Sequence, residues 1–484
     1  MEQEIIIGKY TLESLTDGMY ASPIDLYREY IQNSVDSFDS AKMENLPFAN
    51  DTLLKITVDD KDKRIVFFDN GCGIRESEAV STLIDIGNSR KTRMESRGFR
   101  GIGRLAGLGY CEELVFATSA QGENSKTIVV FDAALLKSLL LSSNERNVSV
   151  SDVMKQVVTI KREPEKPASH YFEVTLNNVA EGSNLLDLEI VNEYLIQHAP
   201  IPFAQNFKWG EAVKEKFRLL NFYIPSYGIE LNGTLLYKAY EDSIVSDRVK
   251  KIEDRIKEIE VKPFYSNGKM IAILWYARTS FYGTILDNTI KGIRIRQGNI
   301  LIGDKSSCNS LFKEERFNGW MIGELYVLDS ELIANSRRDD FEKNDAYYTL
   351  VELFQEWAFA QSKEIRHISY ERSLSREKQA VAEAETIDDI NDLCTEDLSY
   401  EMEFGESDFI DESESDDVAT TDYLGKLTQL LGQKKTQTRY TALNINPRLT
   451  MEQRKSLERV FDLIQEKYEH DQAEEFINYI SRKY

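Results

Sequence analysis

Apolar residues recur every three or four positions between residues 24 and 38, a period that predicts an amphipathic helix over Tyr27–Ala41. The apolar positions are Ile24, Tyr27, Ile31, Val35 and Phe38. On another face, Glu29, Asn33 and Asp36 follow one another at intervals of four and three residues, so their side chains stack. Two carboxylates and an amide can activate a water, ligate Mg²⁺ and hold this arrangement by an inward hydrogen bond. The alternative is an ordinary solvated polar face.

A short apolar run farther along the chain predicts a buried strand that ends in a carboxylate. The run is Ile65–Phe68, and Asp69 follows it directly, before a turn that contains Gly71 and Gly73. Because an unpaired buried charge is costly, Asp69 needs a partner, and the exocyclic amine of adenine is one such partner. The two glycines would let a flat ring approach the backbone. Since D-N-G is also a common turn signal, the alternative is a plain hairpin turn.

Glycines and arginines alternate closely between residues 97 and 109. The glycines are Gly98, Gly101, Gly103, Gly107 and Gly109, and the arginines are Arg97, Arg100 and Arg104. Such a backbone can present bare N–H groups to phosphate oxygens. The segment lacks the strand-then-helix context and the downstream acid of a dinucleotide fold, and no G-K-[ST] follows as in a Walker loop. It therefore indicates a phosphate-binding loop of another kind.

Taken in this order, the three motifs resemble the Bergerat-fold (GHKL) ATPases, which include gyrase, the 90-kDa heat-shock chaperones, histidine kinases and MutL. The first box is matched by Glu29, Asn33 and Asp36, the adenine box by Asp69, Gly71 and Gly73, and the phosphate lid by Gly98, Gly101 and Gly103. The resemblance implies that ATP and Mg²⁺ bind here and that ATP is hydrolysed. It assigns adenine selection to Asp69, the magnesium ligand to Asn33 and activation of the attacking water to Glu29.

Three further residues are candidates for contact with the nucleotide. Ile102 belongs to the lid, together with its glycines. Lys91, in the polar loop 86–93, would reach a phosphate, although a solvated loop lysine is the alternative. Thr127 would contribute a hydroxyl near the adenine, as a threonine does in some relatives.

A second stretch with candidate chemistry is Leu325–Glu342, where a predicted strand ends in a turn that carries Arg337 and Arg338. A guanidinium delivered from a second domain can stabilise charge that develops on a γ-phosphate. The 90-kDa chaperones carry an S-R-E turn at a comparable place. Here the sequence is S-R-R-D, so either arginine is a candidate catalytic residue. The alternative is an interdomain salt bridge with Asp339 or Asp340.

The whole chain is predicted to be an α+β protein of several domains. We expect a Bergerat-fold α/β sandwich ATPase domain at 1–180, an α/β transducer-like middle domain at 181–345, a helical extension at 346–386, an acidic linker at 387–422 and a small helical C-terminal module at 423–484. The linker is inferred from acids without Lys or Arg between residues 388 and 422. Further expected elements are hairpins at 52–69 and 113–132, helices at 191–203, 247–259 and 347–383, and hairpin turns at 267–268 and 298–299.

Composition restricts the possible partners and the compartment. The net charge of −23 over 484 residues argues against broad electrostatic binding to nucleic acid or an acidic membrane. The four cysteines lie far apart without metal-binding spacing, which predicts reduced thiols in a cytoplasmic protein. The first ten residues are too briefly apolar for a signal peptide. No apolar run approaches the roughly 20 residues needed to cross a bilayer.

These observations lead to an ATPase that uses nucleotide to change shape, like the 90-kDa chaperones and the MORC proteins. Because such proteins typically work as ATP-clamped dimers, the resemblance implies an ATP-dependent homodimer with an unidentified protein partner or client. Two alternatives stay open: a nucleotide-gated scaffold with little hydrolysis, and a MutL- or gyrase-like DNA-transaction ATPase, which the net charge disfavours. A histidine kinase is disfavoured because only about two dozen residues precede Glu29, too few for the dimerisation helix that usually comes first.

Overall fold

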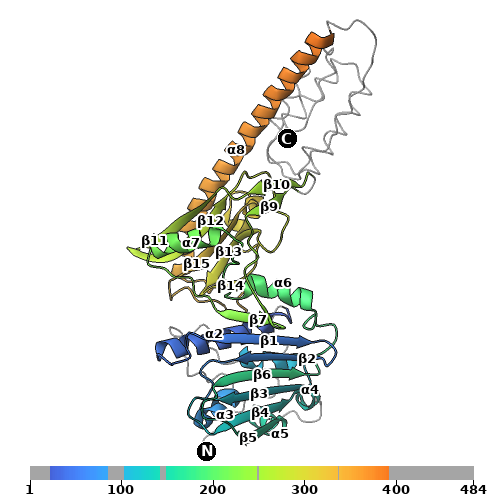
Figure 1. The fold of residues 1–484 in the computed structure, drawn as a ribbon, viewed down its shortest axis with the longest axis vertical. Coiled ribbons are helices and arrows are strands. Elements are labelled where there is room, and N and C mark those ends of the chain that lie inside the picture. Colours follow the sequence, from blue (N-terminus) through green and yellow to red (C-terminus); the bar gives the residue numbers. More distant parts are fainter. Residues whose placement is uncertain (1–21, 86–102, 142–148, 248–249, 336, 392–484) are drawn as a thin grey trace, which may run out of the picture. The chain divides into compact units, whose positions relative to one another are not determined.

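The computed structural model describes residues 22–85, 103–141, 149–247, 250–335 and 337–391 (Figure 1). These residues form an eight-stranded sheet, a five-stranded sheet and a two-stranded sheet, together with helices. The expected α+β composition is therefore present. The C-terminal module at 423–484 and nearly all of the acidic linker lie outside the described residues.

The eight-stranded sheet has the order β5-β4-β3-β6-β2-β1-β7-β8, which can be followed in Figure 1. Its strands are β1 (Leu53–Asp59), β2 (Arg64–Asp69), β3 (Glu113–Ser119), β4 (Ser125–Asp132), β5 (Val158–Pro164), β6 (Tyr171–Asn177), β7 (Gly228–Leu231) and β8 (Thr234–Leu235). Both expected hairpins are confirmed, because β1 pairs with β2 and β3 with β4, each antiparallel. Strand β7 pairs in parallel with β1, although it follows residue 180 in the sequence. The domain boundary expected at residue 180 therefore divides the strands of this sheet.

Helices cover one face of the eight-stranded sheet. They are α2 (Asp25–Met43), α3 (Glu76–Ile84), α4 (Ala133–Leu141), α5 (Val150–Val157) and the 3₁₀ segment η1 (Gly103–Gly109). The predicted apolar stripe of α2 is confirmed as the buried side of that helix. Tyr27 and Tyr30 pack against Phe67 of β2 with ring centroids 5.2 and 4.8 Å apart. This packing determines which face of α2 is left for the polar residues.

The five-stranded sheet has the order β11-β12-β15-β13-β14. Its strands are β11 (Glu258–Ser266), β12 (Lys269–Arg278), β13 (Gly292–Gln297), β14 (Ile300–Ile302) and β15 (Ile322–Val327), and the elements around it are α6 (Leu188–His198), α7 (Trp209–Arg218), η2 (Asn309–Leu311), η3 (Glu315–Trp320) and α8 (Asp345–Asn391). The turns expected at 267–268 and 298–299 are confirmed as the β11–β12 and β13–β14 connections. The N-terminal part of α8 packs with one apolar cluster of this sheet, and α7 with another.

The prediction of a charged helix over 247–259 is wrong. Residues 243–246 and 252–255 instead form the antiparallel strands β9 (Ser243–Ser246) and β10 (Ile252–Arg255). Asp247 and Lys251 adopt left-handed backbone angles, with φ of 67° and 47°, which a helix cannot accommodate. Asp254 is buried, and its Oδ2 accepts a hydrogen bond from the Ser280 N–H at 2.8 Å. Strand pairing and this long-range contact outweigh the local helical pattern.

A buried ion cluster ties the chain leaving the first sheet to the second sheet. Lys238 Nζ lies 2.7 Å from Glu324 Oε2, and Arg296 binds the other oxygen of the same carboxylate. Arg296 Nη2 also donates to the Gln197 carbonyl oxygen of α6 at 2.9 Å. Burial alone would raise the pKa of Glu324, but Arg296 and Lys238 bring it down to about 2. The connection after β8 and the end of α6 are therefore anchored to β13 and β15.

Candidate active site

Helix α2 presents the three polar residues of the first motif. Glu29 and Asp36 are 9% and 6% exposed, and Asn33 is half-buried. The side chain of Asn33 makes no hydrogen bond with the residues that the structure describes. A half-buried amide with uncommitted hydrogen-bonding capacity at this position is compatible with a ligand supplied from outside the chain.

The carboxylate of Asp69 is buried at the end of β2 and is 1% exposed. Its Oδ2 accepts a hydrogen bond from Ser34 Oγ at 2.8 Å, and its Oδ1 accepts one from the Gly71 N–H at 3.0 Å. Burial raises the pKa of Asp69 to about 6 despite these two donors. Each carboxylate oxygen can accept a second hydrogen bond, so Asp69 retains acceptor capacity for a ligand. Sequence reasoning missed Ser34, although it lies in the same helix motif.

The two glycines after Asp69 are required by the packing of the turn. A Cβ on Gly71 would lie 2.2 Å from Ser37 Oγ, and a Cβ on Gly73 would lie 1.9 Å from the Ser119 carbonyl oxygen. Gly73 also has a φ of 64°, which L side chains rarely adopt. The turn therefore lies directly on α2 and on the end of β3. This close approach adds a second reason for glycine to the one inferred from the sequence.

His170 and Phe48 border the same turn, and sequence reasoning missed both. Their rings stack at 14° with centroids 3.6 Å apart. His170 Nδ1 lies 3.0 Å from the Gly71 carbonyl oxygen and 3.1 Å from that of Asn70. The imidazole thus holds the backbone that follows Asp69. No local motif identifies these two residues, because Phe48 follows α2 and His170 precedes β6.

Thr127 lies in the same cross-strand row as Asp69. Asp69 pairs with Phe172, Phe172 with Thr118, and Thr118 with Thr127, so their side chains share one face of the sheet. Three strand spacings place Thr127 about 14 Å from Asp69. Thr127 Oγ1 is buried without a hydrogen-bond partner among the described residues. Thr118 lies closer to Asp69, and its hydroxyl accepts a hydrogen bond from the Ile74 N–H at 2.8 Å.

Glu29 is the meeting point of three chain segments. A Cβ on Gly103 would lie 2.3 Å from Glu29 Oε2, so the carboxylate lies directly against the backbone of η1. Arg338 Nε lies 3.1 Å from Glu29 Oε1. Arg337 is exposed, and its carbonyl oxygen accepts a hydrogen bond from Arg28 Nη2 at 2.8 Å. The turn after β15 therefore contacts α2 and directs Arg338, not Arg337, at Glu29.

The two aspartates of the S-R-R-D turn make other contacts. Asp340 forms an ion pair with Lys343 at 2.6 Å. Asp339 accepts a hydrogen bond from Asn335 Nδ2 at 2.5 Å. These contacts, together with the φ of 55° at Arg338, set the conformation of the turn. The remaining expected site residues, Lys91, Gly98, Gly101 and Ile102, lie outside the described residues.

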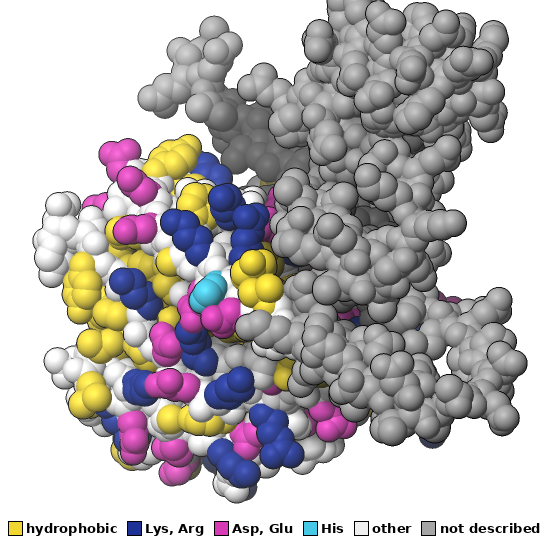
Figure 2. All heavy atoms as spheres, turned by 90° about the horizontal axis from the view of Figure 1, so that it is seen from above, with side chains coloured by type: hydrophobic (Ala, Val, Ile, Leu, Met, Phe, Trp, Pro, Cys, Tyr) yellow, Lys and Arg dark blue, Asp and Glu magenta, His cyan; other side chains and the backbone are white. Residues whose placement is uncertain are grey.

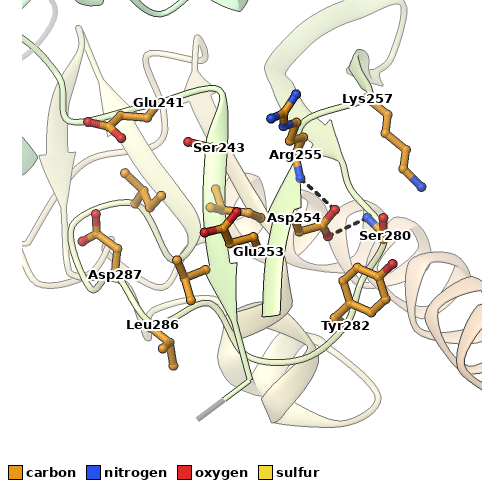
Figure 3. Close-up of a pocket in the computed structure, with 13 residues that line it drawn as sticks. Glu241, Ser243, Glu253, Asp254, Arg255, Lys257, Ser280, Tyr282, Leu286 and Asp287 are labelled. Carbon is orange, nitrogen blue, oxygen red and sulfur yellow. Dashed lines mark hydrogen bonds between the residues drawn. The ribbon is translucent and has the colours of Figure 1, made fainter. Parts of the chain in front are cut away.

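A hollow of about 910 Å³ opens elsewhere, between β9, β10 and the loop 280–290 (Figure 3). Its charged lining residues are Glu241, Glu253, Asp254, Asp287, Arg255 and Lys257. The candidate residues on α2 and β2 do not line it. Its charged lining is mostly acidic and its lining residues include no glycine, which makes it a poor match for phosphate, so its size alone does not make it the active site.

No cluster of three or more His, Cys, Asp or Glu side chains that could hold a metal occurs in the described ranges. This finding is compatible with Mg²⁺, which proteins often bind through one or two side chains while substrate phosphates and waters complete the shell. Asn33 offers one such hard oxygen. Within the same ranges, every helix falls short of the length or the apolarity that a membrane span requires.

Residues 26–156 match the family described as histidine kinase-, DNA gyrase B- and HSP90-like ATPases. No curated protein matches the chain. The matched residues contain α2, the Asp69 turn and η1, which are the elements that build the site. The match supports a GHKL-type ATPase domain and, with it, ATP binding. It applies to the superfamily and not to the chaperone or MORC branch.

Proposed function

We propose that this protein is an ATP-binding and ATP-hydrolysing conformational switch, chaperone-like, with a nucleotide-dependent dimer clamp. The observation that carries the proposal is the 3.1 Å contact between Arg338 Nε and Glu29 Oε1. It joins a turn from the second sheet to the candidate base on α2. A change in phosphate charge beside this ion pair would act on both Glu29 of α2 and Arg338 of the turn after β15.

Five residues that the structure describes have roles in this proposal. Asp69 accepts a hydrogen bond from the adenine amine, and His170 holds the turn that positions Asp69. Glu29 orients the attacking water and takes its proton. Arg338 stabilises charge on the terminal phosphate. Asn33 would hold Mg²⁺, which supplies neutralisation of phosphate charge when bound.

The proposal includes an unidentified protein partner and a cytoplasmic location. The thiols of Cys72, Cys111 and Cys308 are free, which supports a reducing compartment. Basic and acidic side chains are interspersed on the face shown in Figure 2. Together with the net charge of −23, this disfavours a DNA-transaction role, which requires a concentrated basic surface.

The Glu29–Arg338 pair also favours a second candidate, a nucleotide-gated scaffold with little hydrolysis. In this pair the Glu29 carboxylate is already held by the Arg338 guanidinium, so the pair must separate before Glu29 can serve as a base. In this arrangement the chain would bind ATP and change shape, while turnover would need a further rearrangement. The two candidates differ in turnover and agree on nucleotide binding.

The test is hydrolysis by the purified full-length protein, together with its mass with and without a non-hydrolysable ATP analogue. Steady turnover and a mass that doubles with the analogue are expected from the ATPase clamp. A doubled mass without turnover would replace it with the scaffold. Absence of nucleotide binding would overturn both.

Arg338→Ala is expected to lower kcat by about 10- to 100-fold, because a guanidinium at the phosphate contributes mainly to the transition state. Arg337→Ala serves as the matched control, since that side chain is exposed and one residue away. We expect it to change kcat by less than about 3-fold, within the usual effect of an exposed substitution. Equal losses in the two variants would contradict the assignment.

ATP binding is expected to weaken as the pH falls through about 6, the raised pKa of buried Asp69. A protonated carboxyl is a poorer acceptor for the adenine amine, so the Kd at pH 5 should be about 10-fold above that at pH 7. The effect of Asp69 on the free energy of unfolding has the opposite pH dependence to its effect on ATP binding. A raised carboxyl pKa stabilises the fold below about pH 4, and this contribution is lost as the pH rises through about 6. Calorimetric titration across this range would measure the Kd, with Asp69→Asn expected to show no such step.

A further inference from the structure

Three exposed aromatic side chains form a line along α8. Tyr348, Phe359 and Tyr370 are 59%, 43% and 56% exposed. They are separated by 11 residues each, and 11 residues complete three helical turns with only about 20° of drift. The rings therefore follow one another at about 16 Å along one side of the helix. Each ring is a separate exposed contact point, about three helical turns from the next.

The opposite side of α8 is already used. Leu350, Phe354, Trp357, Ala358 and Ile365 are buried and belong to the apolar cluster of the second sheet. Arg278 of β12 also holds the helix through Glu364, with Nη1 2.8 Å from Glu364 Oε2. The aromatic line therefore points away from the sheet on a helix that is fixed in place.

Charges along the aromatic line are divided by Phe359. Glu352 and Glu356 precede it, and Lys363 and Arg366 follow it, although Arg366 already forms an ion pair with Glu314. Counted from Phe359, Glu352 lies seven residues before and Arg366 seven residues after, while Glu356 lies three before and Lys363 four after. Tyr348 and Tyr370 each lie 11 residues from Phe359. A two-fold rotation that reverses the direction of α8 about Phe359 therefore places aromatic residues on aromatic positions and acidic residues at or beside basic positions.

We propose that this face of α8 binds the same face of a second copy of the chain, antiparallel, about a two-fold axis at Phe359. Such a contact is isologous, so each residue before Phe359 meets its counterpart after Phe359 on the partner. Tyr348 meets the partner's Tyr370, and Glu352 and Glu356 meet basic residues. A parallel pair would instead oppose like charges, which is unfavourable. The 11-residue spacing gives the two helices a right-handed crossing.

This contact is small and needs no nucleotide. A strip of about 33 Å by 10 Å covers about 330 Å² per copy, below the roughly 800 Å² of a standard interface. We therefore expect a weak dimer that forms only at high protein concentration and dissociates on dilution, distinct from the ATP-dependent clamp.

Cysteine cross-linking of the full-length protein without nucleotide tests the geometry. Under mild oxidation, Phe359→Cys should form a covalent dimer by itself. Tyr348→Cys and Tyr370→Cys should cross-link only when the two variants are mixed, because a disulfide needs Cα atoms about 4.4–6.8 Å apart. Wild-type protein controls for the natural cysteines. Cross-linking of Tyr348→Cys to itself, or a failure of Phe359→Cys to cross-link at the highest protein concentration that stays in solution, would overturn the proposal.

Charge exchange tests the same contact without cysteines. Glu356→Lys and Lys363→Glu should each lower the dimer fraction in sedimentation at least about 3-fold, and the double variant should restore it. Glu331→Lys, an exposed acid outside α8, should leave the fraction unchanged. Asp69→Asn should also dimerise normally, because this contact does not depend on ATP. A double variant that stays as weak as the singles, or loss of the contact in Asp69→Asn, would contradict the inference.

Discussion

Asp69→Asn is expected to raise the Kd for ATP by at least about 100-fold, because a hydrogen bond to a charged group contributes about 1.5–3 kcal/mol and the new NH₂ group would oppose the adenine amine. The fold should not be weakened. Raising the pKa of a carboxyl from 3.8 to about 6 costs the folded state about 3 kcal/mol when the group is ionised, and asparagine removes this cost. Calorimetric binding and urea unfolding would measure the two effects.

Asp132→Asn is the matched control, since it changes an exposed aspartate at the end of β4 in the same sheet. We expect it to leave the Kd unchanged. If Asp69→Asn bound ATP normally, Asp69 would not be the adenine acceptor. If it failed to bind and also unfolded at lower urea, the loss would reflect the broken Ser34 and Gly71 contacts instead.

Glu29→Ala is expected to lower kcat by about 10²- to 10⁴-fold, the usual contribution of a general base. Nucleotide affinity should stay within about 3-fold of the wild type, because the Asp69 turn is untouched. The variant also leaves Arg338 without its Glu29 partner, so it should be compared with Arg338→Ala. Single-turnover hydrolysis with saturating ATP measures the chemical step directly.

Glu193→Ala controls for the loss of a glutamate on a helix, since Glu193 is exposed on α6. It should keep wild-type turnover. A Glu29→Ala variant that hydrolyses ATP at the wild-type rate would remove Glu29 as the base. A variant that neither binds nor hydrolyses ATP would show that Glu29 serves the architecture of the site and not its chemistry.

Local periodicity correctly predicted the elements whose pattern and burial agree. The α2 stripe and the β1–β2 and β3–β4 hairpins were found because each buries the face that its sequence makes apolar. The N-terminal part of α8 was found for the same reason. In the segment 247–259 the sequence pattern and the structure disagree. Its charges alternate at a helical period, but pairing with β9 and the contact of Asp254 with Ser280 decide its conformation.

Extending the first sheet to β7 and β8 also required tertiary information. Some 50 residues separate β6 from β7, and no local signal shows that the chain returns to pair with β1. Strand pairing depends on long-range register, which a single sequence does not display.

The sequence by itself determined the candidate site as far as it is local. It placed Glu29, Asn33 and Asp36 on one helix and Asp69 at a strand end, because helical and strand periods are properties of neighbouring residues. Only the tertiary structure decided that Arg338, and not Arg337, is directed at Glu29, and that His170 stacks on Phe48 beside the turn. These contacts join residues more than 100 positions apart, and their geometry follows from how the sheets and helices pack.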